Sequence, residues 1–330
     1  MKKCLIVPYF GKFPNYFQLT LDSCGKNLDF DWLIITDNNE DYDYPSNVKV
    51  YKMTFEEFKK LIQIKLKNYI EKIELEKPYK LCDYKVTYGY VLSAYLKNYD
   101  WWGYCDFDII FGKLNNFITD ELLKKYDKLF VFGHFTLYRN TEEINKLFLK
   151  SYGEKKLYEE YFKTSKICAF DELWKESINN IFEKNYKKIF YENFSADIYP
   201  KDVNFRIIFL DILNKKIKVQ KTDKGFFVYD NGKIIKILKN KNEIIKQEYM
   251  YIHLQKRKME CNISTLNRKF YKIIPNIFEN MEINLEELSY NNFFKIKKRK
   301  IDKEYIIKAL YYSYLLKRIK SFGNSIKKRL

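Results

Sequence analysis

The chain has 330 residues, 46% of them hydrophobic, which suffices for one large α/β domain or two small ones and excludes a small disulfide-stapled peptide. Its formal net charge of +18 leads us to expect an acidic partner, such as a nucleic acid, an anionic bilayer or a phosphorylated substrate. Six scattered cysteines indicate reduced thiols, and no apolar run approaches the ~20 residues of a membrane-spanning helix, so we expect a cytoplasmic protein.

Apolar strand patterns and helical patterns alternate over the first 140 residues. Thr54 and Glu57 have the spacing of a capping box, which predicts that a long helix begins there. Strands that alternate with helices predict an α/β fold with a doubly wound, mainly parallel sheet. The strands are expected at residues 4–7, 32–36, 48–53, 100–106, 129–132 and 135–138, and the helices at 15–24, 54–73 and 86–96.

The second part of the chain has a different pattern. Helices are expected at residues 142–150 and 172–182, and Asn231-Gly232 predicts the turn of a hairpin over 226–238. A late strand over 250–254 carries His253. We expect three parts: a Rossmann-like half at residues 1–140, a second half at 141–262 that includes the late strand, and a basic helical tail at 263–330.

The strongest chemical signal is the segment 101–112, in which Asp106 and Asp108 follow a hydrophobic strand. In open α/β sheets, ligands bind beyond the carboxyl ends of the strands. A divalent cation prefers oxygen ligands there and can neutralise the charge of a leaving diphosphate. Asp-any-Asp is also common in surface turns, but the apolar flanks and Gly112 favour a metal site.

The two histidines of the chain are further candidates. His253 is followed by Gln255, Lys256 and Arg257, so it could complete a metal site while Lys256 meets phosphate groups. A hydrogen-bonded histidine in the core is an equally good interpretation. His134 is a candidate contact to the acceptor or donor sugar, with a structural role at a strand turn as its alternative.

Polar residues in two other segments could also bind a ligand. Lys80, Asp83 and Lys85 precede the predicted helix at 86–96; a carboxylate there could accept sugar hydroxyls and a lysine could bind phosphate, unless the group is a solvated turn. Asp171 and Glu172 are the best remaining carboxylates for acceptor binding or proton abstraction, so we assign them as candidate catalytic residues. The alternative is that they cap the next helix.

Other motifs of common enzyme classes do not occur in the sequence. There is no glycine-rich phosphate loop of either standard spacing and no serine-centred elbow. The residues alone leave two functions open. One is a metal-dependent nucleotidyl or phosphoryl transferase, and the other is a nucleic-acid-binding protein. The basic excess lies mostly in one tail rather than among exposed aromatics, so we expect no nucleic acid partner.

With these residues considered, the chain resembles the GT-A glycosyltransferases, and more closely an uncharacterised family encoded in bacterial capsule and lipopolysaccharide loci. The resemblance covers about the first 200 residues. It depends on five motifs together with Phe170-Asp171-Glu172: Pro8–Lys12, Trp32–Asp37, Pro78–Lys85, Asp106–Asp108 and Gly133–Tyr138.

The resemblance implies a GT-A, Rossmann-like sheet flanked by helices with a C-terminal α+β extension, and transfer of a sugar to a hydroxyl of a bacterial surface glycan. It implies Mn²⁺ or Mg²⁺ at Asp106 and Asp108, a nucleotide-sugar donor that is most often UDP-linked, a glycan or lipid-linked acceptor, and retention of configuration. It makes residues 1–140 the nucleotide-sugar-binding half and residues 141–262 the acceptor-side half. It places the nucleotide and donor sugar near Pro8, Tyr9, Asp37, Asp83, Lys85 and Phe107.

The tail at residues 295–330 holds thirteen Lys or Arg against two acids, a net +11 of the total +18. Apolar residues recur in it at helical spacing, which predicts a basic amphipathic helix. Such a helix could lie on an anionic membrane on the inner face of the plasma membrane, or it could pack on the body of the protein or on a second subunit.

Overall fold

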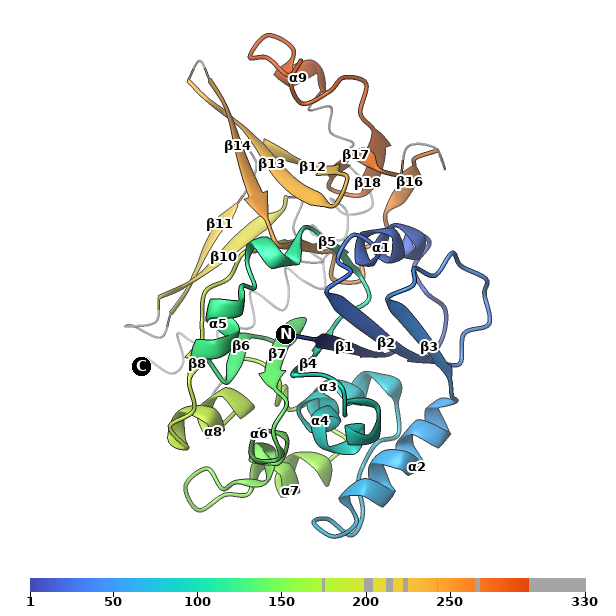
Figure 1. The fold of residues 1–330 in the computed structure, drawn as a ribbon, viewed down its shortest axis with the longest axis vertical. Coiled ribbons are helices and arrows are strands. Elements are labelled where there is room, and N and C mark those ends of the chain that lie inside the picture. Colours follow the sequence, from blue (N-terminus) through green and yellow to red (C-terminus); the bar gives the residue numbers. More distant parts are fainter. Residues whose placement is uncertain are drawn as a thin grey trace, which may run out of the picture.

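The computed structural model describes residues 1–173, 176–198, 204–211, 216–221, 225–241, 243–264 and 268–296. In this part of the chain, strands form three sheets, and most helices accompany the first one (Figure 1). The predicted tail at 295–330 lies outside the described residues from 297 onward.

The first sheet has the order β3-β2-β1-β4-β7-β6-β8. Its first four strands in this order run parallel, whereas β7 is antiparallel to both β4 and β6. The mainly parallel sheet expected from the sequence is therefore present. Its strands are β1 (Lys3–Pro8), β2 (Phe30–Thr36), β3 (Val48–Lys52), β4 (Trp101–Cys105), β6 (Lys128–Phe132), β7 (Phe135–Arg139) and β8 (Ile189–Phe190).

Helices cover both faces of this sheet, which explains why its central strands are almost entirely apolar. Along β1, Cys4 and Ile6 face one hydrophobic core, while Leu5 and Val7 face another. The first core is closed by α2 (Phe55–Leu66), α3 (Leu81–Tyr84), α4 (Tyr88–Val91), α6 (Glu142–Asn145), α7 (Leu157–Phe162) and α8 (Ile178–Lys184). The second core is closed by α1 (Phe17–Cys24) and α5 (Asp120–Lys125).

Two further sheets hold most strands after residue 190. The second has the order β11-β10-β9-β15-β5 and the third β14-β13-β12-β17-β18-β16. Most of their pairings are antiparallel, and the parallel exceptions are β9 with β15 and β16 with β18. The second sheet comprises β5 (Ile109–Phe111), β9 (Ser195–Asp197), β10 (Arg206–Asp211), β11 (Lys216–Lys221) and β15 (Tyr251–His253). The third comprises β12 (Gly225–Asp230), β13 (Lys233–Asn240), β14 (Glu243–Tyr249), β16 (Glu260–Asn262), β17 (Phe270–Ile274) and β18 (Ile277–Asn280), with α9 (Phe293–Ile296) packed against it.

The hairpin expected at 226–238 is confirmed as β12 and β13. Asn231 and Gly232 both have positive φ, 43° and 98°, as a two-residue hairpin turn requires. The third sheet contains residues on both sides of the expected boundary at 262, and the division of the chain at 140 and 262 stays a prediction.

The capping box is also confirmed: Thr54 and Glu57 exchange hydrogen bonds at the start of α2. The predicted end of this helix at residue 73 is wrong, because α2 ends at Leu66. The side chain of Gln63 donates to the Glu71 carbonyl and accepts from the Ile73 amide, so it supports an irregular segment in place of further helical turns.

Two other predicted helices differ from the structure. The segment at 86–96 is a succession of short turns, 3₁₀ at Lys85–Thr87, α4, and 3₁₀ at Ser93–Tyr95. In the first of these turns, the Thr87 hydroxyl donates to the Tyr84 carbonyl. The helix expected at 172–182 begins only after Ser177, whose amide donates to the Asn180 side chain. The segment at 142–150 divides into α6 and a 3₁₀ turn at Leu147–Leu149, and further 3₁₀ turns are Pro78–Lys80 and Leu114–Asn116.

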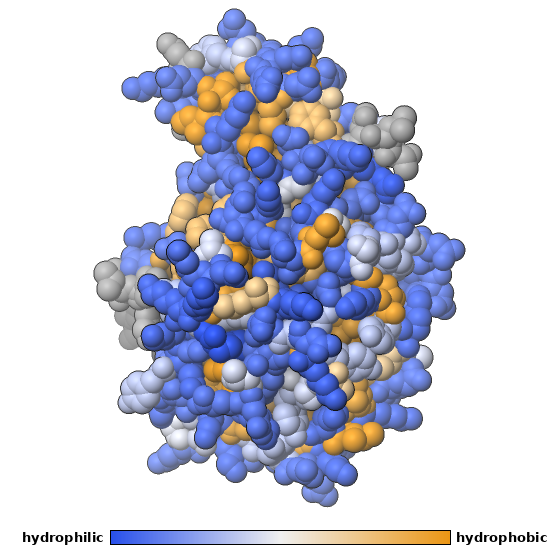
Figure 2. Space-filling model, viewed as in Figure 1, coloured by the Kyte–Doolittle hydropathy of each residue, from blue (hydrophilic) through white to orange (hydrophobic). Residues whose placement is uncertain are grey.

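The surface in Figure 2 is mainly hydrophilic, with small hydrophobic patches, one of them over the end of the molecule that holds the third sheet. All six cysteines are free thiols, as the sequence led us to expect. Among the described residues, no helix is both long and apolar enough to cross a membrane.

Candidate functional site

Three strands bring the predicted metal ligands together. Asp106 and Asp108 lie between the end of β4 and the start of β5, and His253 is the last residue of β15. Because β15 pairs antiparallel with β5, His253 lies opposite Ile109, next to Asp108. The ligand atoms of Asp106, Asp108 and His253 lie within 4.8 Å of one another, so the structure brings the three predicted residues into one cluster.

Asp108 is 2% exposed, yet its Oδ1 atom has no hydrogen-bond partner. Its Oδ2 atom accepts from the backbone amide of Lys256. Nε2 of His253 lies 3.4 Å from Oδ1. A buried carboxylate oxygen without a partner is costly, so this atom is directed at a position where a cation would satisfy it.

The charges in this cluster are strongly coupled. Burial acts to lower the pKa of His253, but Asp108 and Asp106 raise it to about 10, so this histidine carries a proton when no cation is bound. Burial acts to raise the pKa of Asp106, but Lys85 and His253 hold it well below its usual range. A cation and a proton on His253 would therefore compete for the same carboxylates.

Lys85 connects the metal cluster to the second pair of carboxylates. Its Nζ atom lies 2.8 Å from Asp106 Oδ1, 2.8 Å from the Gly133 carbonyl oxygen and 3.5 Å from Asp171 Oδ2. Burial raises the pKa of Asp171 to about 8 against the opposing effect of Lys85, and burial also raises the pKa of Glu172. The two predicted catalytic residues thus lie beside the Asp106, Asp108 and His253 cluster: Asp171 is buried, Glu172 is half-buried, and both have a raised pKa.

Gly133 allows these carboxylates to approach the sheet. A Cβ atom at this position would lie 2.4 Å from Asp171 Oδ2 and 2.8 Å from Glu172 Oε1, both too close for a side chain. Next to it, His134 is buried, stacks on His253 with ring centroids 4.4 Å apart, and has no hydrogen-bond partner for Nε2. Burial lowers the pKa of His134 well below its usual range, so it stays neutral.

A cavity of about 670 Å³ opens onto this cluster at the carboxyl ends of β1 and β4. The structure places most of the predicted site residues in its lining. These are Pro8, Tyr9, Lys85, Asp106, Phe107, Asp108, His134, Asp171, Glu172, His253 and Lys256.

Aromatic rings and a lysine form the outer part of the cavity. The Tyr9 and Phe107 rings are in contact, with centroids 3.7 Å apart. Across the cavity lining, the Lys256 ammonium lies 4.1 Å from the centre of the Tyr79 ring, which is 63% exposed. Gln255 and Lys256 both have positive φ, so the chain turns sharply after His253 and directs the Lys256 amide at Asp108.

Three predicted ligand contacts lie outside this lining. Asp37 accepts from the Gly11 amide and so fixes the loop after β1. Lys80 and Asp83 form a buried ion pair with N to O distance 2.7 Å. Direct contact of these three side chains with a donor stays a prediction that the cavity does not support.

Sequence reasoning missed Gly133, Tyr79 and Gln255 as parts of the site. Gly133 precedes His134 directly, and Tyr79 stands in a motif noted for its neighbours Lys80 and Asp83, so adjacency was the available signal. The Gln255 side chain, just after β15, donates to Asp197 at the end of β9 at 2.7 Å. No local pattern in the sequence indicates this contact.

The chain matches, over residues 5–282, a family described as a family of unknown function (DUF6625). No curated protein matches the sequence. Among solved structures, a similar chain is the galactosyltransferase LgtC in complex with donor and acceptor sugar analogs. It is 10% identical, and the match covers 60% of this chain and 76% of that one with a TM-score of 0.33. A likeness at this level leaves the function to be argued from the site itself.

Proposed function

The chain belongs to the family of unknown function DUF6625, and we propose that it is a metal-dependent glycosyltransferase of the GT-A type. One observation carries the proposal. A carboxylate oxygen of Asp108 is buried without a hydrogen-bond partner, 3.4 Å from His253 and next to Asp106, in a cavity that also holds cationic and acidic side chains. This combination suits a ligand that has both a diphosphate and a sugar.

The residues present fit a divalent cation. Two carboxylates and one imidazole are suitable ligands for Mn²⁺, while the two carboxylates alone suit Mg²⁺. Asp106, Asp108 and His253 would hold the ion, and Lys85 would have to give up part of its contact with Asp106. When bound, such an ion neutralises charge on the leaving diphosphate.

We assign roles to several other residues of the lining. Lys256, which is exposed, would meet a phosphate oxygen, and the Tyr9 and Phe107 rings would contact the nucleotide base. Asp171 and Glu172 are assigned to the acceptor hydroxyl. A pKa near 8 at Asp171 suits proton exchange close to neutral pH, where general acid–base catalysis is most effective.

The finer assignments are proposals as well. We propose a UDP-linked donor and a hydroxyl of a bacterial surface glycan as acceptor, in the cytoplasm. Docking of residues 295–330 on an anionic membrane belongs to this proposal too, although the tail from 297 lies outside the described residues. A metal-dependent nucleotidyl or phosphoryl transferase would use the same cluster, and only its products differ.

The test is donor binding followed by transfer. Calorimetry with a panel of UDP-sugars and Mn²⁺ should show binding by the wild-type protein, and by an Asp41→Asn control, which removes an exposed carboxylate outside the cavity. Asp108→Asn should remove metal-dependent binding with the fold intact. Label from the sugar should then appear on an acceptor or, without acceptor, in free sugar.

Two outcomes would refute the proposal. If no nucleotide sugar binds with Mn²⁺ or Mg²⁺, the site has another ligand. If label from a nucleotide's phosphate, rather than from its sugar, moves to the second substrate, the protein is a nucleotidyl or phosphoryl transferase.

A further inference from the structure

A second cavity, of about 770 Å³, lies at the amino-terminal ends of the parallel strands of the first sheet, opposite the end that holds the metal candidates. Its walls come from the start of β1, the start of β2, the edge strand β3 and the segment from Tyr95 to Asp100. Strand β1 runs from this cavity to the candidate metal cluster, and its six residues span roughly 17 Å at about 3.3 Å per residue. No residue lines both cavities, so they are separate sites.

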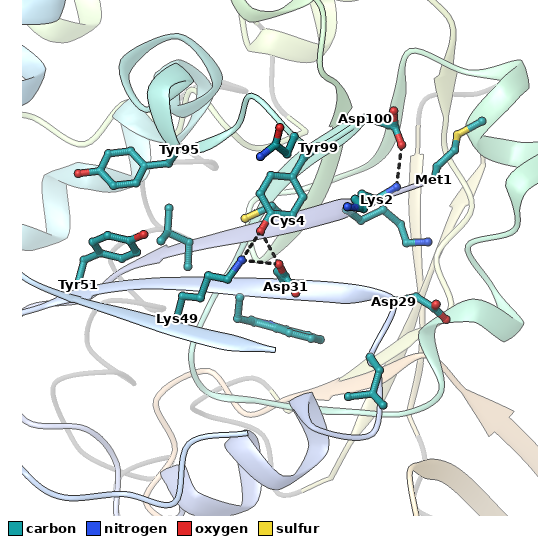
Figure 3. Close-up of a pocket in the computed structure, with 15 residues that line it drawn as sticks. Met1, Lys2, Cys4, Asp29, Asp31, Lys49, Tyr51, Tyr95, Tyr99 and Asp100 are labelled. Carbon is teal, nitrogen blue, oxygen red and sulfur yellow. Dashed lines mark hydrogen bonds and ion pairs between the residues drawn. The ribbon is translucent and has the colours of Figure 1, made fainter. Parts of the chain in front are cut away.

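Three side chains form a fixed polar centre in this cavity. Lys49 Nζ lies 2.8 Å from Asp31 Oδ2 and 2.9 Å from the Tyr99 hydroxyl, which itself donates to Asp31 (Figure 3). Each of the three still has hydrogen-bonding capacity, because a carboxylate accepts several bonds and an ammonium donates three. A centre that is already ordered loses little conformational entropy when a ligand binds.

Two partly exposed tyrosine rings extend the cavity on one side. Tyr51 and Tyr95 are 39% and 37% exposed, and their rings meet edge to face with centroids 5.0 Å apart. In Figure 3 this pair lies on one side of the polar centre, and Asp29, Lys2 and Asp100 lie on the other. The cavity is therefore elongated, with an aromatic end and a charged end.

The charged residues of the lining balance one another. A nucleotide or phosphate would gain little from this lining, because the repulsion of the three carboxylates offsets the attraction of the three lysines. A ligand with many hydroxyl groups fits better, because each hydroxyl donates to a carboxylate and accepts from an ammonium group. The charged lining residues are Lys2, Lys3, Lys49, Asp29, Asp31 and Asp100.

We propose that this cavity binds a hydroxyl-rich oligosaccharide. The apolar C–H face of one sugar ring packs on the tyrosine pair of Tyr51 and Tyr95, and hydroxyls of the neighbouring ring bond to Asp31 and Lys49. This site goes beyond the proposed transfer reaction, because it needs neither a metal nor a nucleotide and lies at the opposite ends of the parallel strands.

The experiment uses the full chain in EDTA, so that the metal cluster does not contribute. A glycan array of bacterial oligosaccharides identifies binders, and saturation-transfer NMR with titration measures their affinity. Tyr51→Ala and Tyr95→Ala should each weaken binding roughly fivefold to tenfold, the effect of one lost aromatic contact. Asp31→Asn should also weaken it, because the amide group replaces a carboxylate acceptor.

Two variants serve as controls. Tyr290→Ala removes a tyrosine that is also 39% exposed but lies outside both cavities, and it should bind as the wild type does. Asp108→Asn should also bind normally, which separates this site from the candidate metal cluster. Circular dichroism confirms that each variant is folded.

Three results would overturn the proposal. The first is an array on which no oligosaccharide is retained. The second is oligosaccharide binding that Tyr51→Ala and Tyr95→Ala leave unchanged. The third is binding of UMP or inorganic pyrophosphate that these two variants abolish. None of these results bears on sugar transfer, so the proposed function would have to be tested by its own experiment.

Discussion

Two lysine–aspartate pairs have opposite properties in the structure, although Lys80, Asp83 and Lys85 lie within six residues of one another in the sequence. Lys80 and Asp83 are 3% and 0% exposed, and neither lines a described cavity. Asp83 accepts from Lys80 and from the backbone amides of Cys168 and Phe170, so both of its oxygens are satisfied. This pair fixes the loop that leads to Asp171.

Lys85 and Asp106, in contrast, line the cavity of about 670 Å³. Their neighbours Asp108 and His253 each have a buried atom without a hydrogen-bond partner. A closed pair of this kind stabilises a loop, whereas an open pair beside unsatisfied atoms can exchange partners for a ligand. The difference lies in the surroundings of the side chains, because the residue types are the same.

The largest effect is expected at the closed pair. Asp83→Asn leaves Lys80 as a buried charge without its counterion and turns an amide donor toward backbone N–H groups, so unfolding free energy should fall by about 3–5 kcal/mol. Urea denaturation measures this. Lys146→Gln, which breaks the exposed pair with Glu142, should leave stability unchanged. An Asp83→Asn protein as stable as the wild type would contradict a structural role.

The second prediction concerns the open pair. Metal should stabilise the protein against unfolding only by binding to Asp106, Asp108 and His253. Mn²⁺ at about 100 times its dissociation constant should stabilise the wild-type protein by about 2.7 kcal/mol. The same addition should leave Asp108→Asn unchanged, while Asp41→Asn responds like the wild type. Thermal unfolding with and without Mn²⁺ gives the answer, and an equal response of Asp108→Asn would place the metal elsewhere.

A smaller effect is expected at Gly133, which contacts Lys85 of the open pair and Asp171 of the loop that the closed pair fixes. Gly133→Ala would bring a methyl group against Asp171 and Glu172, and relieving this overlap should cost about 1–3 kcal/mol and displace both carboxylates. Donor binding should persist while transfer falls. Gly153→Ala is the comparison: its Cβ would meet nothing within 4 Å, although its φ of 67° is strained for alanine, so transfer should survive.

The last expected effect concerns the pH dependence of stability. The pKa of Asp171 is about 8 in the folded protein because of burial, against about 3.9 for an unfolded aspartate. Between these values the unfolded chain has lost a proton that the folded chain keeps, so this group's contribution to stability falls as pH rises from 4 to 8. Asp171→Asn should remove this loss of stability between pH 4 and pH 8, because the amide does not titrate. Parallel stability profiles of wild type and variant at pH 5 and 8 would contradict the raised pKa.

Local patterns in the sequence determined the strands of the first sheet except β8, and part of the site. The apolar runs of β1, β2 and β3 and the capping box of α2 are properties of neighbouring residues, so spacing was sufficient to predict them. The same holds for Asp106 and Asp108, which are adjacent to the end of a strand. Where side chains bond back to the backbone, as at Gln63 and Thr87, local periodicity failed to give the helix boundaries.

Only the tertiary structure decided which charged residues face the cavity. The pairing of β15 with β5 brings His253 to Asp108 across a long stretch of chain, and the burial of Lys80 and Asp83 separates them from Lys85. Gly133 has its role because Asp171 packs against it. Such contacts depend on sheet order and on the packing of distant segments, and a side chain's own neighbours in the sequence do not encode them.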